Sequence, residues 1–214
     1  DYLLARLAER NGNVALAIEN YHSVASRNSI LRAYALFHLS QCSRSMGNLL
    51  MERIYLERIL IETPGSLLIS VAQARLARSS NEAENYSSAA THLLTNDGKQ
   101  AKPENTTRGT NYWRDDQVLL GEIRMRQGRT VDAQSIFSSL ISSMPNVDQP
   151  DDASRSASRG LDLIAGGKFD GTTVSVGKLT EAEHLQRAKI YQFNRDFRLA
   201  KAHFEAVSGV ASSP

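Results

Sequence analysis

The chain has 214 residues, of which 41% are hydrophobic and 22% charged, so it carries enough apolar material for a continuous core. Its formal net charge of +2 is too balanced to indicate a nucleic-acid-binding protein. Its single cysteine, Cys42, excludes an internal disulfide, so cysteine content does not indicate whether the chain resides in an oxidising or a reducing compartment. No apolar run approaches the ~20 residues of a membrane span, so we expect no membrane-spanning helix.

Apolar residues recur every three or four positions along most of the chain, which is the period of an amphipathic helix. This period predicts five helical hairpins in chain order. They span about 1–27, 29–62, 66–95, 112–143 and 180–208. A loop is expected at 96–111, and an irregular helix followed by a loop at 146–179. The prediction is a single helical domain over 1–214.

The irregular segment has its own start and stop signals. Asp151 and Asp152 are suited to cap a helix that runs through Ile164. Gly166 and Gly167 are expected to end it, with loop from there to residue 179. The segment 172–176 alternates as a strand does, but it lies among glycines, and we assign it to that loop.

The hairpins share a repeated pattern of residue types around their turns. Gly12, Gly47 and Gly128 end a first helix, and Pro64 and Pro145 follow a second one. Each second helix carries an anchor residue, and four of the five anchors are small enough for two helices to cross closely: Ala17, Glu52, Ala89, Ala133 and Ala200. The anchors are 35, 37, 44 and 67 residues apart, and the first two spacings are close to a repeat of about 34 residues. Larger side chains follow to fill the space between hairpins: Tyr21, Leu56, Leu93, Phe137 and Phe204.

With this pattern the chain resembles the tetratricopeptide repeat (TPR) family. The segment from Leu120 to Pro145 is the most faithful match, whereas Glu84 replaces the turn glycine of the third hairpin and Glu52 the small anchor of the second. The resemblance implies an all-α fold, a right-handed TPR-like superhelix (α-solenoid) of about five helical hairpins. It also implies binding rather than catalysis, without naming the ligand.

A narrower resemblance concerns two segments, 72–78 and 187–204. They are similar to helical-repeat stretches of the N-terminal region of bacterial soluble lytic murein transglycosylases. In that family an α-superhelix precedes a catalytic domain whose acid is a Glu followed by Ser, and no Glu-Ser pair occurs in this chain. The resemblance therefore implies, at most, the non-catalytic superhelical module of such an enzyme.

No catalytic or metal-binding constellation is predicted, so we expect no enzyme activity in this chain and no cofactor. The histidines are dispersed, with no second histidine four residues from His184, and Cys42 has no adjacent activating charge. The glycines around Lys168 lack the spacing of a phosphate-binding loop. Asp115–Asp116 and Asp151–Asp152 are suited to helix starts rather than to a metal. Trp113 is expected to pack against the preceding hairpin.

One pattern favours a ligand site. In TPR arrays the first helices of the hairpins line a concave groove, and counting from the crossing residues selects ten positions. These are Arg6, Arg10, Gln41, Arg44, Arg78, Asn81, Glu122, Arg126, Lys189 and Gln192. Six of them are cationic and one is acidic in a nearly neutral chain, which favours an acidic peptide, a carboxyl terminus or an anionic polymer. The alternative is an ordinary solvated face, because arginine is also a good helix former.

The functional prediction is a non-catalytic TPR scaffold that binds a protein, peptide or polymer in a concave, mildly basic groove. Two alternatives stay open. The first is the superhelical module of a cell-wall lytic transglycosylase, with a peptidoglycan-related partner and a periplasmic location. The second is an assembly module whose terminal hairpins dock on other copies of the chain. Outside the transglycosylase alternative a cytoplasmic location is expected, and no nucleic acid is expected as a partner.

Overall fold

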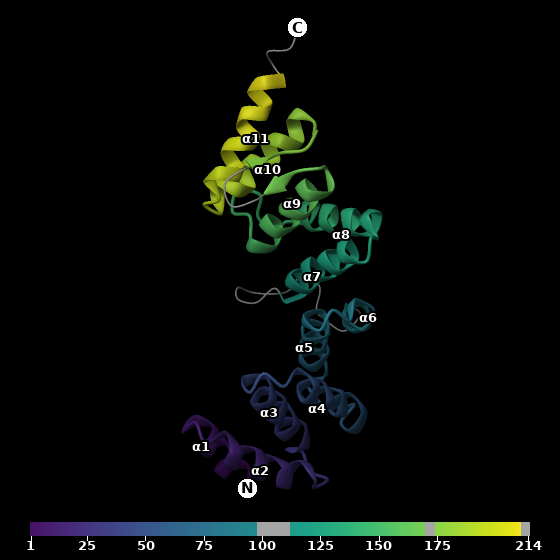
Figure 1. Cartoon of the computed structure of the whole chain (residues 1–214), viewed down its shortest axis with the longest axis vertical. Helices are drawn as coiled ribbons and strands as arrows, with labels where there is room; N and C mark the ends of the chain where they lie inside the picture. The colour runs from purple at the N-terminus through teal and green to yellow at the C-terminus, as the bar shows by residue number, and fades with distance from the viewer. Residues whose placement is uncertain (98–111, 170–173, 211–214) are drawn as a thin grey trace. The chain divides into compact units, whose positions relative to one another are not determined.

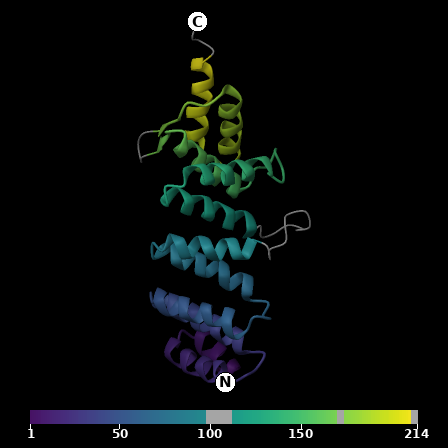
Figure 2. The same cartoon turned by 90° about the vertical axis from the view of Figure 1, so that its right-hand side faces the viewer.

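The computed structural model describes residues 1–97, 112–169 and 174–210 (Figure 1). The chain divides into two compact units, Asp1–Gln100 and Ala101–Pro214, called unit 1 and unit 2. The described part of unit 1 consists of six helices: α1 (Tyr2–Arg10), α2 (Val14–Ala25), α3 (Arg32–Ser45), α4 (Leu49–Glu62), α5 (Ile69–Glu82) and α6 (Tyr86–Asp97). They pair as the hairpins α1–α2, α3–α4 and α5–α6, which follow one another in layers in Figure 2.

Unit 2 contains two more hairpins of this kind and one irregular insertion. Its elements are α7 (Tyr112–Arg126), α8 (Thr130–Ser142), α9 (Asp152–Ile164), β1 (Lys168–Phe169), β2 (Val174–Ser175), α10 (Glu181–Phe193) and α11 (Phe197–Val210). Helices α7 and α8 form one hairpin, α10 and α11 the other, and α9 packs on α8. The predicted all-α class and the repeated hairpins are confirmed.

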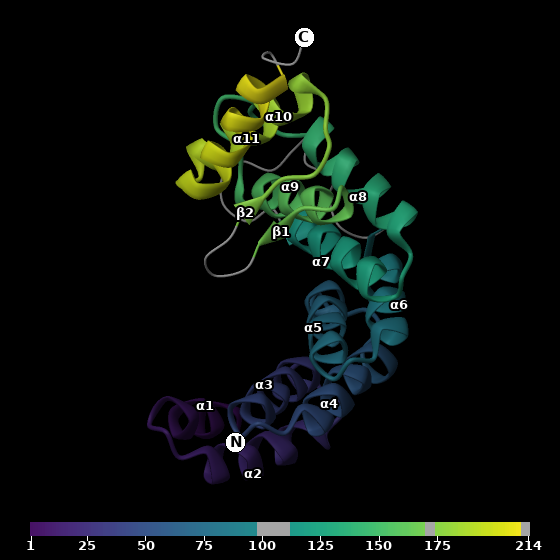
Figure 3. The same cartoon turned by 45° about the horizontal axis from the view of Figure 1, so that its top comes forward.

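The insertion between α8 and α10 agrees with the sequence-based prediction at the start of α9 and differs from it after the end of α9. Asp151 caps α9 as expected, because its side chain accepts a hydrogen bond from the backbone N–H of Ser154. The segment after α9 was expected to be loop throughout. It contains a short antiparallel ladder that pairs Lys168 with Ser175 and Phe169 with Val174, drawn beside α9 in Figure 3. Phe169 and Val174 pack on the buried Tyr191 cluster, which gives this ladder an apolar support.

Five hairpins turn through a residue with a left-handed backbone. The expected glycines Gly12, Gly47 and Gly128 have φ values of 74°, 73° and 73°. Where the glycine is missing, Glu84 and Arg195 take the same conformation, with φ values of 57° and 62°. The turn is therefore set by the hairpin packing even where the residue type opposes it.

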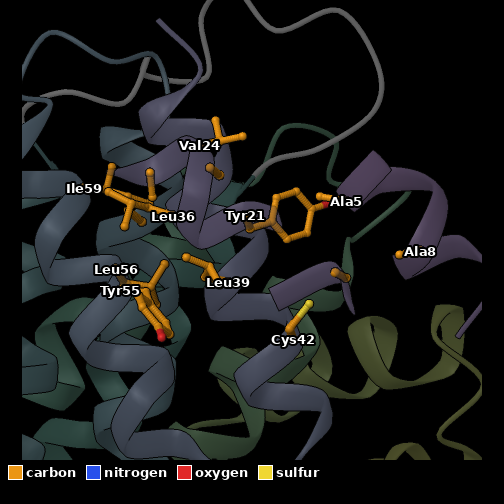
Figure 4. Packing of buried hydrophobic residues seen from close by; sticks show 14 of the residues in the cluster. Ala5, Ala8, Tyr21, Val24, Leu36, Leu39, Cys42, Tyr55, Leu56 and Ile59 are labelled. Atoms are coloured by element: carbon orange, nitrogen blue, oxygen red, sulfur yellow. The ribbon is translucent and has the colours of Figure 1, made fainter. Parts of the chain in front are cut away.

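The core of unit 1 is built from the positions that the repeat pattern selected (Figure 4). The Tyr21 ring points toward Ala5 of α1, and Leu36 lies beside Ile59. All four side chains are fully buried. The anchors Ala17, Ala89, Ala133 and Ala200 are buried as well, as the close crossing of paired helices requires.

Glu52 is the exception among the anchors, since it places a fully buried carboxylate at a helix crossing. Its charge is met by two arginines from neighbouring helices. The Arg44 Nη1 atom lies 3.1 Å from Glu52 Oε2, and Arg75 Nη2 lies 3.7 Å from Glu52 Oε1. The second hairpin therefore accepts a large acidic residue because first helices on both sides supply cations.

In unit 2 a single aromatic ring joins three helices. Phe137 of α8 is fully buried, and its ring atoms occupy the space beside Gly121 of α7 and Gly160 of α9. An ideal Cβ atom on either glycine would stand less than 3 Å from that ring. Trp113 was expected to pack against the preceding hairpin, and the structure places it against the cluster around Phe137, in the core of unit 2.

A second junction in unit 2 is polar. The fully buried Arg114 of α7 donates to Asp151 Oδ2 at 2.6 Å and to the Leu140 carbonyl at 2.9 Å. It also donates to the hydroxyl of Ser154 at 3.0 Å. One guanidinium thus binds the end of α8 and the start of α9 together.

Candidate functional site

The ten predicted groove residues all lie on first helices, and none of them is buried. Arg6 and Arg10 are on α1, Gln41 and Arg44 on α3, Arg78 and Asn81 on α5, Glu122 and Arg126 on α7, and Lys189 and Gln192 on α10. Six therefore belong to unit 1 and four to unit 2. The geometry of a site can be built within each unit.

In unit 1 the first of these arginines is already engaged. Arg6 Nη1 lies 2.8 Å from Glu9 Oε2 and 3.0 Å from His38 Nδ1. Glu9 also accepts a hydrogen bond of 2.5 Å from the hydroxyl of Tyr21. Although burial opposes ionisation of Glu9, the Tyr21 hydroxyl, His38 and Arg6 lower its pKa. Arg6 is thus part of a cluster that joins α1, α2 and α3.

Arg44 is engaged in the same way. Besides the buried Glu52, it contacts Glu82 of α5, with Arg44 Nη2 at 2.6 Å from Glu82 Oε1. The counting of groove positions missed Glu9 and Glu82, because each lies one residue away from a selected position on its helix. The net positive charge around the selected positions is therefore smaller than those positions alone indicate.

Unit 1 nevertheless has an uneven charge distribution between its two kinds of helix. The first helices α1, α3 and α5 carry two carboxylates, Glu9 and Glu82, and six arginines: Arg6, Arg10, Arg32, Arg44, Arg75 and Arg78. The second helices α2 and α4 show the reverse, with two arginines, Arg53 and Arg58, and four glutamates: Glu19, Glu52, Glu57 and Glu62. The positive potential of unit 1 thus belongs to its first helices.

Aromatic and apolar side chains accompany these arginines. The Arg75 guanidinium lies over the Phe37 ring, 5.3 Å from its centroid. Tyr34 and Val71 are exposed on α3 and α5. A hollow of about 370 Å³ lies beside Tyr34, lined by Ile30 and by the loop from Thr63 to Leu67. The first-helix side of unit 1 can therefore contact both charged and apolar groups of a ligand.

In unit 2 the structure brings together two histidines that are far apart in the sequence. His184 Nδ1 and His203 Nδ1 are 2.9 Å apart, and His203 Nε2 lies 3.1 Å from Asp162 Oδ2. Asp162 also accepts hydrogen bonds from Tyr191, at 2.5 Å, and from Arg187. All five side chains are buried, so they form a polar core that links α9, α10 and α11.

The described residues contain no group of three or more histidine, cysteine or acidic side chains placed to hold a metal ion. Cys42 is buried, and burial raises the pKa of its thiol, which disfavours the reactive thiolate. Within the same residues, no helix has both the length and the apolar character needed to cross a membrane.

Comparison with known proteins supports the architecture. No protein-family model and no curated protein sequence matches the chain. Among solved structures, it is similar to the TPR-like repeats of a putative kinesin light chain from Podosopora anserina, at 15% identity and a TM-score of 0.55, over 99% of this chain and 93% of that one. It is also similar to MamA from AMB-1, at 15% identity and a TM-score of 0.50, over 98% of this chain and 89% of that one.

This chain has a TPR-like fold. At such low identities the likeness concerns the fold alone, and the ligand has to be argued from the side chains. Neither of these two neighbours is a lytic transglycosylase, so that alternative stays a prediction.

Proposed function

We propose that this chain is a TPR-like scaffold that binds a protein or peptide partner on the first helices of its hairpins. The observation that carries the proposal is the charge distribution of unit 1, where arginine is concentrated on α1, α3 and α5 and glutamate on α2 and α4. An acidic peptide segment fits such a face. Arginine suits this task because its guanidinium can bind a carboxylate through two parallel hydrogen bonds.

The two kinds of arginine on this face have different roles in the proposal. Arg6 and Arg44 are bound to Glu9, Glu52 and Glu82, so they hold the framework of the site. Arg10 is exposed, and Arg78 is partly exposed at the selected position of α5. We assign ligand contacts primarily to Arg10 because of its exposure, and we include Arg78 for its place on α5, where it has contacts of its own within the chain.

The test uses a fluorescently labelled acidic peptide of mixed Glu and apolar residues as a probe. Arg10→Glu combined with Arg78→Glu is expected to weaken binding at least about tenfold, because each change replaces an attraction with a repulsion. Binding by the unaltered chain should also weaken as salt is raised. Circular dichroism checks that this double variant keeps the helicity of the unaltered chain.

The matched control changes the same charge away from the first helices, with Arg53→Glu and Arg27→Glu. Arg53 lies on α4, and Arg27 is the second residue after the end of α2. These substitutions should leave the affinity within about twofold. Equal losses in both variants would refute a site on the first helices, and no binding of any acidic probe would refute the ligand class.

A further inference from the structure

The buried polar core of unit 2 contains two histidine rings in direct contact. His184 of α10 and His203 of α11 face each other through their Nδ1 atoms, which are 2.9 Å apart. His184 is 3% exposed and His203 is fully buried, so the two rings have little access to water. On the far side of His203, its Nε2 atom lies 3.1 Å from Asp162 Oδ2 of α9. One line of hydrogen bonds therefore runs from α10 through α11 to α9.

The partners of this line of hydrogen bonds determine where its protons lie. Asp162 forms an ion pair with Arg187, and a carboxylate can only accept, so Nε2 of His203 carries the proton that it donates to Asp162. Nδ1 of the neutral His203 ring is then an acceptor, and Nδ1 of His184 carries the proton between the two rings. The contact between the rings thus holds a single proton.

Acid adds protons that this arrangement accommodates only once. The first additional proton binds Nε2 of His184 and makes that ring a cation. A second one has to enter the contact between the rings, where two N–H groups would face each other across 2.9 Å. Both donors would then lack an acceptor, and two buried cations would lie side by side. The doubly protonated pair is therefore incompatible with the packing of α11 on α10.

The surrounding charges do not compensate a second cation. The charged and titratable groups that act on His184 come from all three helices: Glu183 and Arg187 on α10, Asp162 on α9 and His203 on α11. The negative charge of Asp162 is already balanced by Arg187 before any histidine is protonated. Glu183 accepts hydrogen bonds from Thr180 at the start of α10. Burial, followed by His203, lowers the pKa of His184, which favours the neutral pair near pH 7.

We propose that His184 and His203 form an acid-operated latch, which holds α11 on α10 and α9 at neutral pH and releases it when both rings are protonated. The released state is a local opening of α10 and α11 in which both imidazolium rings reach water. The open state binds two additional protons and the closed state at most one. Opening therefore becomes about tenfold more favourable for each pH unit below about 6.5.

Hydrogen exchange of the whole chain, measured by mass spectrometry at about pH 7.5 and about pH 5, tests the latch. After correction for the intrinsic exchange rates, the amides of α10 and α11 are expected to exchange at least about tenfold faster at the lower pH. Helices α7 and α8 belong to the same unit and contain no histidine, so their corrected exchange should change less than about twofold.

Replacing both rings by amides separates the latch from other effects of acid. In the double variant His184→Gln with His203→Gln, neither side chain takes up a proton in this pH range, so the exchange of α10 and α11 should change less than about twofold. His92→Gln is the matched control, because His92 lies on α6 and burial lowers its pKa as well. This control should keep the full acid response of α10 and α11.

Nitrogen NMR of the histidine rings tests the proton positions in the unaltered chain and does not require the double variant to fold. At about pH 7.5 His184 should carry its proton on Nδ1 and His203 on Nε2. The opposite pair of tautomers would overturn the latch, because the line of hydrogen bonds to Asp162 would not exist as described.

Three results of the exchange experiment would also refute the proposal. Equal exchange of α10 and α11 at both pH values would show that no opening occurs. Equal loosening of α7 and α8 would indicate general acid unfolding instead of a local release. An acid response that persists in the double variant would assign it to other groups. None of these results involves the arginines of unit 1, so the latch is tested independently of the ligand site.

Discussion

Phe137 of α8 and Gly160 of α9 approach so closely that no side chain fits between them. An ideal Cβ atom on Gly160 would lie 2.3 Å from Phe137 Cε2, and one on Gly121 of α7 would lie 2.4 Å from Cε1 of the same ring. The ring therefore sets the distance between α7, α8 and α9. This contact explains why two glycines are kept inside helices, where glycine is otherwise unfavourable.

The first prediction concerns this contact. Gly160→Ala and Gly121→Ala should each destabilise the chain by about 1–3 kcal/mol, because the added methyl group forces the Phe137 ring and the neighbouring helices apart. Urea unfolding followed by circular dichroism measures the change. Gly65→Ala is the control, since nothing lies within 4 Å of its Cβ position, and it should have little effect. Equal stabilities of all three variants would contradict the close approach.

The second prediction concerns the turns. Arg195→Gly and Glu84→Gly should raise the midpoint of thermal unfolding, because these residues hold a left-handed backbone that costs a side-chain-bearing residue about 1 kcal/mol. Gly128→Ala, which introduces the same cost at the equivalent turn, should lower the midpoint. Differential scanning calorimetry compares the three variants with the parent. An unchanged midpoint for Gly128→Ala would show that the turn can adapt.

The third prediction concerns Arg114. Although burial opposes ionisation of Asp151, the hydrogen bonds from Arg114 and Ser154 lower its pKa. Arg114→Met should cost about 3 kcal/mol, because Asp151 and the Leu140 carbonyl lose a buried donor.

Chemical denaturation of Arg114→Met and Arg155→Met separates this effect from loss of charge. Arg155 also pairs with an aspartate on α9, Asp152, but Asp152 is exposed and Arg155 partly exposed, so its removal should cost less than about 1 kcal/mol. Similar losses in the two variants would argue against a structural role for the buried guanidinium.

The fourth prediction concerns pH. Burial, and then the neighbouring His203, lower the pKa of His184, with Arg187 acting in the same direction and Asp162 and Glu183 opposing it. The folded state therefore takes up a proton on His184 less readily than the unfolded chain. The resulting stability is complete above the unfolded pKa of about 6.5 and is lost as the pH falls below it toward the folded value.

The free energy of unfolding should accordingly fall between about pH 7 and pH 5. His184→Gln should make this dependence shallower without removing it, because burial also lowers the pKa of His22, His38 and His92. Urea titrations at a series of pH values give the slope. An unchanged slope in His184→Gln would mean that His184 titrates alike in both states.

The hairpins were predictable from the sequence because their signals are local. A left-handed turn, a small crossing residue and a helical apolar period each act within a few residues, so Gly128, Ala133 and Phe137 sufficed to place one hairpin. The cap at Asp151 was found for the same reason. The ladder of β1 and β2 was not predicted, because its short strands are supported by packing on Tyr191 and Leu199, which lie further along the chain.

The helices and their turns thus follow from local signals in the chain. Which charges meet depends on how the helices pack, because partners such as Arg44 and Glu82, or His184 and His203, lie on different helices. The same holds for exposure. Tyr21 and Phe204 occupy equivalent positions in the repeat, and only the packing around each of them decides that one is core and the other is surface.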